Sequence, residues 1–104
     1  MHQRYDSALE VKYSTPGSVG MEGYTISTNI SRGGMRLPLS KFIRTGETIN
    51  LEIETNDRKA KVAAVGKVKW SKPISRPSPL QLDAGVEFIR IDSQDADRLL
   101  AALS

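Results

Sequence analysis

The chain of 104 residues has no cysteine, one histidine and no long run of apolar residues. Without cysteine it can have no disulfide, no thiol nucleophile and no thiolate zinc site. His2 is the only imidazole, so a Ser–His or Cys–His catalytic pair is not available. No apolar stretch approaches the roughly 20 residues that cross a bilayer, and no glycine-rich phosphate loop is present. The sequence predicts a cytoplasmic domain that is not an enzyme, with no membrane span, metal or cofactor.

Charge and aromatic content narrow the class of partner. Fifteen Lys and Arg residues stand against 12 Asp and Glu residues, and the net charge of +3 mildly favours an anionic partner. A basic barrel that binds single-stranded nucleic acid is one interpretation. However, the chain has only two Phe, three Tyr and one Trp, with no visible stacking platform, so nucleic acid is not the expected partner. The length fits a single domain over residues 1–104.

Hydrophobicity alternates with a period of two over most of the chain, which is typical of strands with one buried face. The expected buried faces are Leu9/Val11/Tyr13, Tyr24/Ile26/Thr28/Ile30, Ile49/Leu51/Ile53, Val62/Ala64/Gly66/Val68/Trp70 and Ala84/Val86/Phe88. A short strand over 35–37 should stop at Pro38, and a loop containing Pro73, Pro77 and Pro79 should follow Trp70. The alternation shifts at Ile89, where we expect a bulge or a strand end.

The C-terminal residues change to a helical period. Ala96, Leu99, Leu100 and Leu103 have the spacing of one helix face, and Asp92 or Ser93 can cap its start. Asp92, Asp95 and Asp97 could ligate a metal, but acidic residues are common at helix starts. The sequence therefore predicts a mainly all-β fold. We expect a small six-stranded antiparallel β-barrel over about 7–91, with a short C-terminal α-helix over about 93–103.

The segment 29–36 carries the residues best suited to bind a ligand. Asn29 and Ser31 are two apart at a strand end, so their side chains share a face and can hydrogen-bond one ligand edge. Gly33 and Gly34 permit a positive φ and close approach of a ligand, and Arg32 adds positive charge. An ordinary turn uses the same residue types, so this segment alone leaves both interpretations open.

Several motifs of the chain, and the order in which they occur, resemble those of one protein family. Asn29-x-Ser31-x-x-Gly34 resembles the [D/N]xSxxG motif of the PilZ domain, the bacterial receptor module for the second messenger cyclic di-GMP. Four other segments are similar to family segments and follow in the same order: Arg4-Tyr5 before the first strand, Gly46-Glu47, the G-x-V-x-W strand at 66–70 and the GVxF strand at 85–88. Together they cover nearly all of residues 4–103.

The resemblance implies a ligand and a set of contacts. Asn29 and Ser31 would hydrogen-bond a guanine edge, Gly34 would give the backbone its close turn, and Arg4 would be the second arginine of the family's RxxxR motif. Arg32, Tyr5 and Trp70 are further candidates with less support. Trp70 shares its expected strand face with Val62, Ala64 and Val68, so core packing is the favoured interpretation for this ring.

Two functions are consistent with the resemblance. In the first, cyclic di-GMP binding orders the N-terminal arm and changes the interaction with an unidentified protein effector. In the second, the domain is a degenerate PilZ-like adaptor that binds no nucleotide, because counting back from Arg4 places the first arginine of RxxxR before Met1.

Overall fold

The structure is a computed structural model that describes residues 5–6, 9–16, 22–40, 43–54, 61–74 and 81–101, apart from the side chains of 5, 6 and 100. Eight strands and one helix lie in these residues. Their bounds are β1 Tyr5–Asp6, β2 Glu10–Ser14, β3 Glu22–Ile26, β4 Asn29–Ser31, β5 Gly34–Ser40, β6 Thr48–Glu54, β7 Lys61–Ile74, β8 Gln81–Ile91 and α1 Ser93–Ala101.

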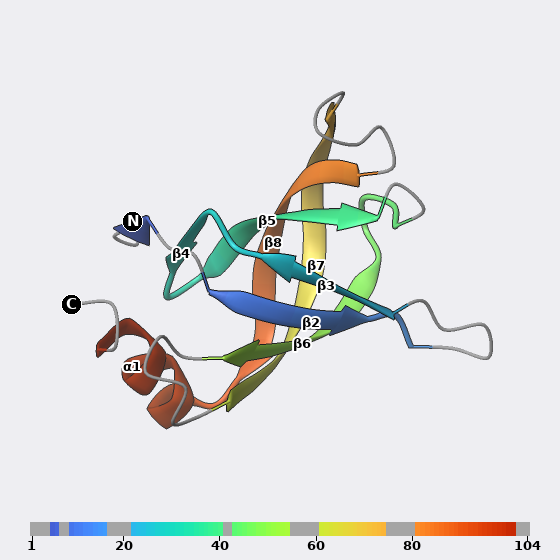
Figure 1. Ribbon diagram of the computed structural model, residues 1–104. Helices are drawn as coiled ribbons and strands as arrows, with labels where there is room; N and C mark the ends of the chain where they lie inside the picture. The colour runs from blue at the N-terminus through green and yellow to red at the C-terminus, as the bar shows by residue number, and fades with distance from the viewer. Residues whose placement is uncertain are drawn as a thin grey trace.

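The strands form one antiparallel sheet in the order β1-β4-β5-β8-β7-β6-β2-β3. The sheet curls until β3 lies near β5, which makes a half-barrel (Figure 1). Alternate side chains point inward and form the core, whose fully buried members include Leu9, Val11, Leu37, Ile49 and Ile53. The predicted fold class is confirmed. The number of strands is larger than the predicted six because β1 is added and the run over 24–30 divides into two strands.

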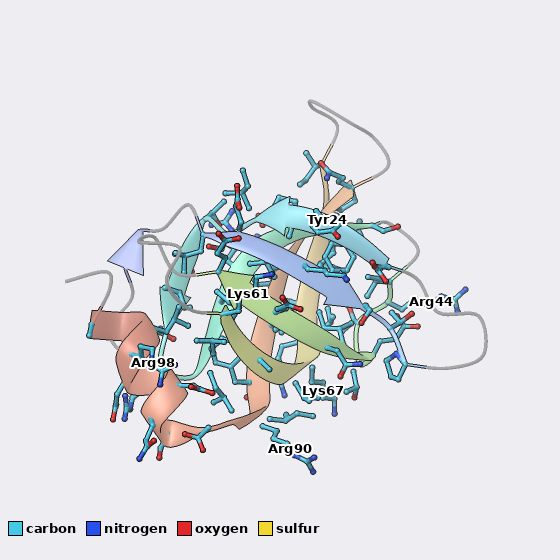
Figure 2. The ribbon with its side chains drawn as sticks, turned by 60° about the horizontal axis from the view of Figure 1, so that its bottom comes forward. Tyr24, Arg44, Lys61, Lys67, Arg90 and Arg98 are labelled. Atoms are coloured by element: carbon cyan, nitrogen blue, oxygen red, sulfur yellow. The ribbon has the colours of Figure 1, made fainter. Side chains whose placement is uncertain are left out.

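The run over 24–30 divides at Ser27. Tyr24 is 75% exposed and Ile26 54% exposed, and Thr28 is exposed as well, whereas Ser27 is buried. The predicted inward face is therefore wrong for Tyr24, Ile26 and Thr28 and right for Ile30 (Figure 2 labels Tyr24). Ser27 N–H donates to Leu9 O at 2.9 Å, and Leu9 N–H donates to Ser27 Oγ at 3.2 Å. The chain leaves β2 at this corner and pairs with β5 next, which resets the alternation of side chains.

Two prolines lie inside strands, which the sequence analysis did not expect. Pro38 is within β5 opposite Asp83, and Pro73 is within β7 opposite Leu82. At each proline the strand is paired with β8 alone, because its pairing with a second strand has already ended among the described residues. On a stretch with one partner strand, as on an edge strand, only one side of the backbone takes part in the ladder, which is where a proline is tolerated. Pro77 and Pro79 lie outside the described residues.

Two bulges interrupt the pairing of β7 with β8. The register passes from Gly66–Phe88 to Val65–Arg90, which leaves Ile89 unpaired and confirms the expected bulge. A second shift lies between Val68 and Trp70, where β7 carries the extra residue. One added residue moves every later side chain to the opposite face of the strand. Val68 is buried, but Trp70 is 37% exposed, so the favoured interpretation of Trp70 as a core residue is wrong.

Helix α1 lies at one end of the curled sheet, on the same side as β1 and β4 (Figure 1). Asp92 Oδ1 accepts hydrogen bonds from the N–H groups of Gln94 at 2.8 Å and Asp95 at 3.4 Å, which confirms Asp92 as its cap. Ala96 and Leu99 are buried. The helix is described as far as Ala101, and the predicted Leu103 lies outside the described residues. Within the described residues, no helix has the length and apolar character needed to span a bilayer.

We predict that Ser27→Ala lowers the free energy of unfolding by about 1–3 kcal/mol, because the buried Leu9 N–H loses its side-chain acceptor. Thermal and urea denaturation monitored by circular dichroism measure this loss. Ser93→Ala removes an exposed hydroxyl from the first turn of α1 and should change stability by less than about 0.5 kcal/mol. Equal effects of the two substitutions would contradict a structural role for the Ser27 hydroxyl.

Candidate functional site

The β4–β5 hairpin holds the motif identified in the sequence. Ser31 is opposite Gly34 and Asn29 is opposite Arg36, so two residues form the turn. Ser31 Oγ accepts a hydrogen bond from Gly33 N–H at 3.3 Å and donates to Gly34 O at 3.5 Å. Both contacts are longer than a typical hydroxyl hydrogen bond, and a hydroxyl has two acceptor lone pairs. Ser31 therefore stabilises the turn and keeps capacity to accept a further hydrogen bond.

Gly34 is required for close packing between strands. A Cβ atom at this position would lie 2.1 Å from Val86 O, a backbone atom of β8. The expectation of a positive φ is wrong for Gly34, whose φ lies outside that region; a positive φ of 94° is found at Gly46 instead. The glycine at position 34 lets β5 and the turn approach β8, and it leaves the outer surface there without a side chain.

The strand register aligns the motif residues in two rows across the outer surface. One row runs Asn29, Arg36, Gly85, Trp70 across β4, β5, β8 and β7, and the next runs Ser31, Gly34, Glu87, Lys67 across the same strands. Each row contains one glycine, and the two glycines are on neighbouring strands. Neither Gly34 nor Gly85 adds a side chain to this surface.

A pocket of about 510 Å³ lies at this place. Three of the predicted site residues line it, namely Ser31, Gly34 and Trp70. The complete lining is Ser31, Gly33, Gly34, Met35, Lys69, Trp70, Gly85, Val86, Glu87 and Phe88. Asn29 and Arg32 do not line it, although Asn29 lies two residues before Ser31 on the same face of β4. Lys69 and Glu87 were not predicted from the sequence. Glu87 is brought beside Gly34 and Ser31 by the register of β4, β5 and β8, and Lys69 is the extra residue of the bulge in β7, so both positions depend on strand pairing.

The indole ring of Trp70 lies against Gly85 and between two cations. A Cβ atom at Gly85 would be 2.1 Å from Trp70 Nε1, so the ring occupies the space that a side chain would need. The Arg36 guanidinium carbon is 5.8 Å from the ring centroid, and Lys72 Nζ is 5.7 Å from it. These are cation–π distances. The aromatic surface is therefore fixed in place and surrounded by positive charge.

Arg36 is itself held by a carboxylate. Its Nε donates a hydrogen bond to Asp83 Oδ1 at 3.0 Å, and its Nη2 donates one to Asp83 Oδ2. This hydrogen-bonded ion pair raises the pKa of Arg36 above its ordinary value. The guanidinium stays charged and oriented beside Trp70, as bidentate pairing favours.

The other predicted residues lie around the pocket or outside the described part of the chain. Arg32, in the β4–β5 turn, forms an ion pair with Asp97 of α1. Arg4 and the side chain of Tyr5 lie outside the described residues, but the Tyr5 backbone pairs with Ile30, so the N-terminal segment enters the sheet beside β4. In the part of the chain that the structure describes, no group of acidic or histidine side chains could hold a metal ion.

The architecture is that of a small antiparallel β-barrel domain with a pocket on its outer surface at a strand-pair turn. The PilZ domain family model matches residues 1–104, and the chain belongs to the PilZ domain family. No curated protein sequence matches the chain.

Solved structures share this fold. The Bacillus subtilis inhibitor of motility MotI (DgrA) is 24% identical, with a TM-score of 0.76, over 97% of this chain and 47% of its own. The PilZ domain of Escherichia coli YcgR, solved with c-di-GMP, is 11% identical with a TM-score of 0.67, over 98% and 86%. MrkH of K. pneumonia, in a c-di-GMP complex, is 15% identical with a TM-score of 0.69, over 98% and 49%. The chain therefore spans about half the length of MotI and MrkH.

We predict that Gly34→Ala destabilises the fold more than Gly85→Ala does. The first new methyl group meets a backbone oxygen, which cannot move without shifting a strand, and the second meets a side chain. Thermal denaturation of the two variants gives the comparison. A smaller loss for Gly34→Ala would contradict the close approach to Val86.

Gly85→Ala should displace the only tryptophan and shift its fluorescence to longer wavelength. The stability cost of this change should vanish in a Trp70→Ala background, because no ring remains to be displaced. An unchanged emission spectrum for Gly85→Ala would show that the ring does not rest on Gly85.

Proposed function

We propose that this domain binds cyclic di-GMP in the pocket between the β4–β5 turn and Trp70. The observation that carries the proposal is that Ser31, Gly34 and Trp70, far apart in the sequence, line one pocket. Two proteins with the same fold, YcgR and MrkH, were solved with this nucleotide. The match to the PilZ family supports a receptor module in place of a catalyst.

The side chains around the pocket suit the chemical groups of a cyclic dinucleotide. The Asn29 amide and the Ser31 hydroxyl both donate and accept hydrogen bonds, as recognition of a base edge requires. The exposed Trp70 ring offers a surface on which a purine can stack. Lys69 lines the pocket, and Arg36 and Lys72 flank the ring, so cations are available for the two phosphodiesters. Arg4 adds a further cation from the N-terminal segment.

The N-terminal segment supplies the response to the ligand in this proposal. Strand β1 has two residues, and it joins the sheet at an edge, beside the strand that carries Asn29 and Ser31. Binding of a phosphodiester by Arg4 would order the arm that precedes β1 and change the surface offered to a protein effector. The lack of cysteine supports a cytoplasmic location, which stays a prediction.

Calorimetric titration of the chain with cyclic di-GMP tests the proposal, with GTP as the control ligand. We expect micromolar or tighter binding that is selective over GTP, accompanied by a change in the fluorescence of Trp70. Absence of binding, in the chain and also in a form extended upstream of Met1, would reject the proposal. The domain would then be the PilZ-like adaptor that binds no nucleotide.

Asn29→Ala should weaken cyclic di-GMP binding by about ten- to a hundredfold, and its melting temperature is measured to verify that the fold is retained. The matched control is Asn50→Ala, which removes an exposed amide from β6. Ser31→Ala should weaken binding and also lower the melting temperature, because its hydroxyl stabilises the turn. Binding that is equal for Asn29→Ala and Asn50→Ala would remove Asn29 from the site.

A further inference from the structure

One acidic side chain lies in a pocket that is otherwise lined by cationic, polar and apolar groups. Glu87 of β8 is exposed and lines the pocket together with Ser31, Gly34 and Lys69. It occupies the variable position of the GVxF segment, so the motif does not account for it. A carboxylate reduces the affinity of a site for phosphodiesters unless it makes a contact that compensates for the repulsion.

The position of Glu87 relative to Ser31 indicates such a contact. Gly34 of β5 lies between the two residues in the sheet: it is opposite Ser31 on one side and opposite Glu87 on the other. Two strand spacings, about 10 Å, separate the backbones of Ser31 and Glu87. Gly34 has no side chain to fill the space between them. A planar base lying over Gly34 would have the hydroxyl at one edge and the carboxylate at the opposite edge.

Guanine presents a pair of donors that matches a carboxylate. Its Watson–Crick edge carries the N1–H and the exocyclic N2 amino group side by side. An ionised carboxylate has two oxygens and accepts both hydrogen bonds at once, whereas the amide of Asn29 has a single acceptor oxygen. An adenine base offers no such donor pair. A carboxylate in this pocket therefore selects guanine over adenine.

We propose that Glu87 is a specificity-determining residue, which accepts hydrogen bonds from N1–H and the N2 amino group of a guanine base lying over Gly34. This inference rests on the proposed function and assigns its base selectivity to a residue outside the [D/N]xSxxG motif. Lys67 lies opposite Glu87 on β7, and Lys69 lines the same pocket (Figure 2 labels Lys67). These two ammonium groups offset the repulsion between the carboxylate and the phosphodiesters.

The test is Glu87→Gln, titrated with cyclic di-GMP and with the cyclic dinucleotide of hypoxanthine, which lacks the N2 amino group. Glutamine keeps the size of the side chain but removes one acceptor and the charge. The matched control is Glu10→Gln, which makes the same change of charge at an exposed position of β2 outside this pocket. Melting temperatures of both variants verify that the fold is retained.

We expect Glu87→Gln to weaken cyclic di-GMP binding at least tenfold and to weaken binding of the hypoxanthine analogue by less than a third of that factor. Discrimination against cyclic di-AMP should fall by a similar factor. Glu10→Gln should leave all three affinities within twofold.

A change in affinity of the opposite sign, tighter binding instead of weaker, would overturn the inference. If Glu87 acts only as a negative charge near the phosphodiesters, Glu87→Gln strengthens the binding of all three dinucleotides. An equal loss for cyclic di-GMP and for the hypoxanthine analogue would also overturn it, because the N2 amino group would then make no contact with Glu87. Failure of both the unmodified chain and the form extended upstream of Met1 to bind cyclic di-GMP would instead reject the proposed function, and this inference with it.

Discussion

The approach of Gly34 to the carbonyl oxygen of Val86 is the contact on which the candidate site depends. It brings the β4–β5 turn against β8, and the backbone contact from Phe88 N–H to Gly33 O at 2.9 Å holds the turn there. Gly34 also lines the pocket. The residue that permits the packing of two strands therefore lies in the wall of the candidate site.

The second constraint is electrostatic and concerns the opposite wall of the pocket. Asp83 orients Arg36, Arg36 lies beside the ring of Trp70, and the ring rests on Gly85. Each group restricts the next, so the aromatic surface is positioned before a ligand arrives. A preorganised surface loses less conformational entropy on binding than a mobile side chain does. This wall comes from three strands, whereas the opposite wall comes from a single hairpin.

The sequence predicted the parts of the fold that depend on unbroken alternation. The inward faces of β2 and β6 and the cap at Asp92 follow from local patterns, and the structure confirms them. The predictions for Tyr24, Ile26 and Trp70 were wrong because a corner at Ser27 and a bulge at Lys69 each reset the alternation. Ser31 and Gly34 were found through their motif. Glu87 was not, because its neighbours are set by the register between strands rather than by the order along the chain.

The bulge at Lys69 has a consequence for how this surface can change during evolution. Trp70 lies outside the barrel because β7 has one residue more than β8 needs between Val68 and Trp70. Insertion of one residue into β8 between Gly85 and Val86 would give Lys69 a partner, restore the regular alternation along β7, turn the indole toward the core and remove one wall of the pocket. An in-frame insertion of a single codon in β8 could thus convert a domain with this pocket into one without it. Related domains with the same fold can differ in ligand binding through so small a change in length.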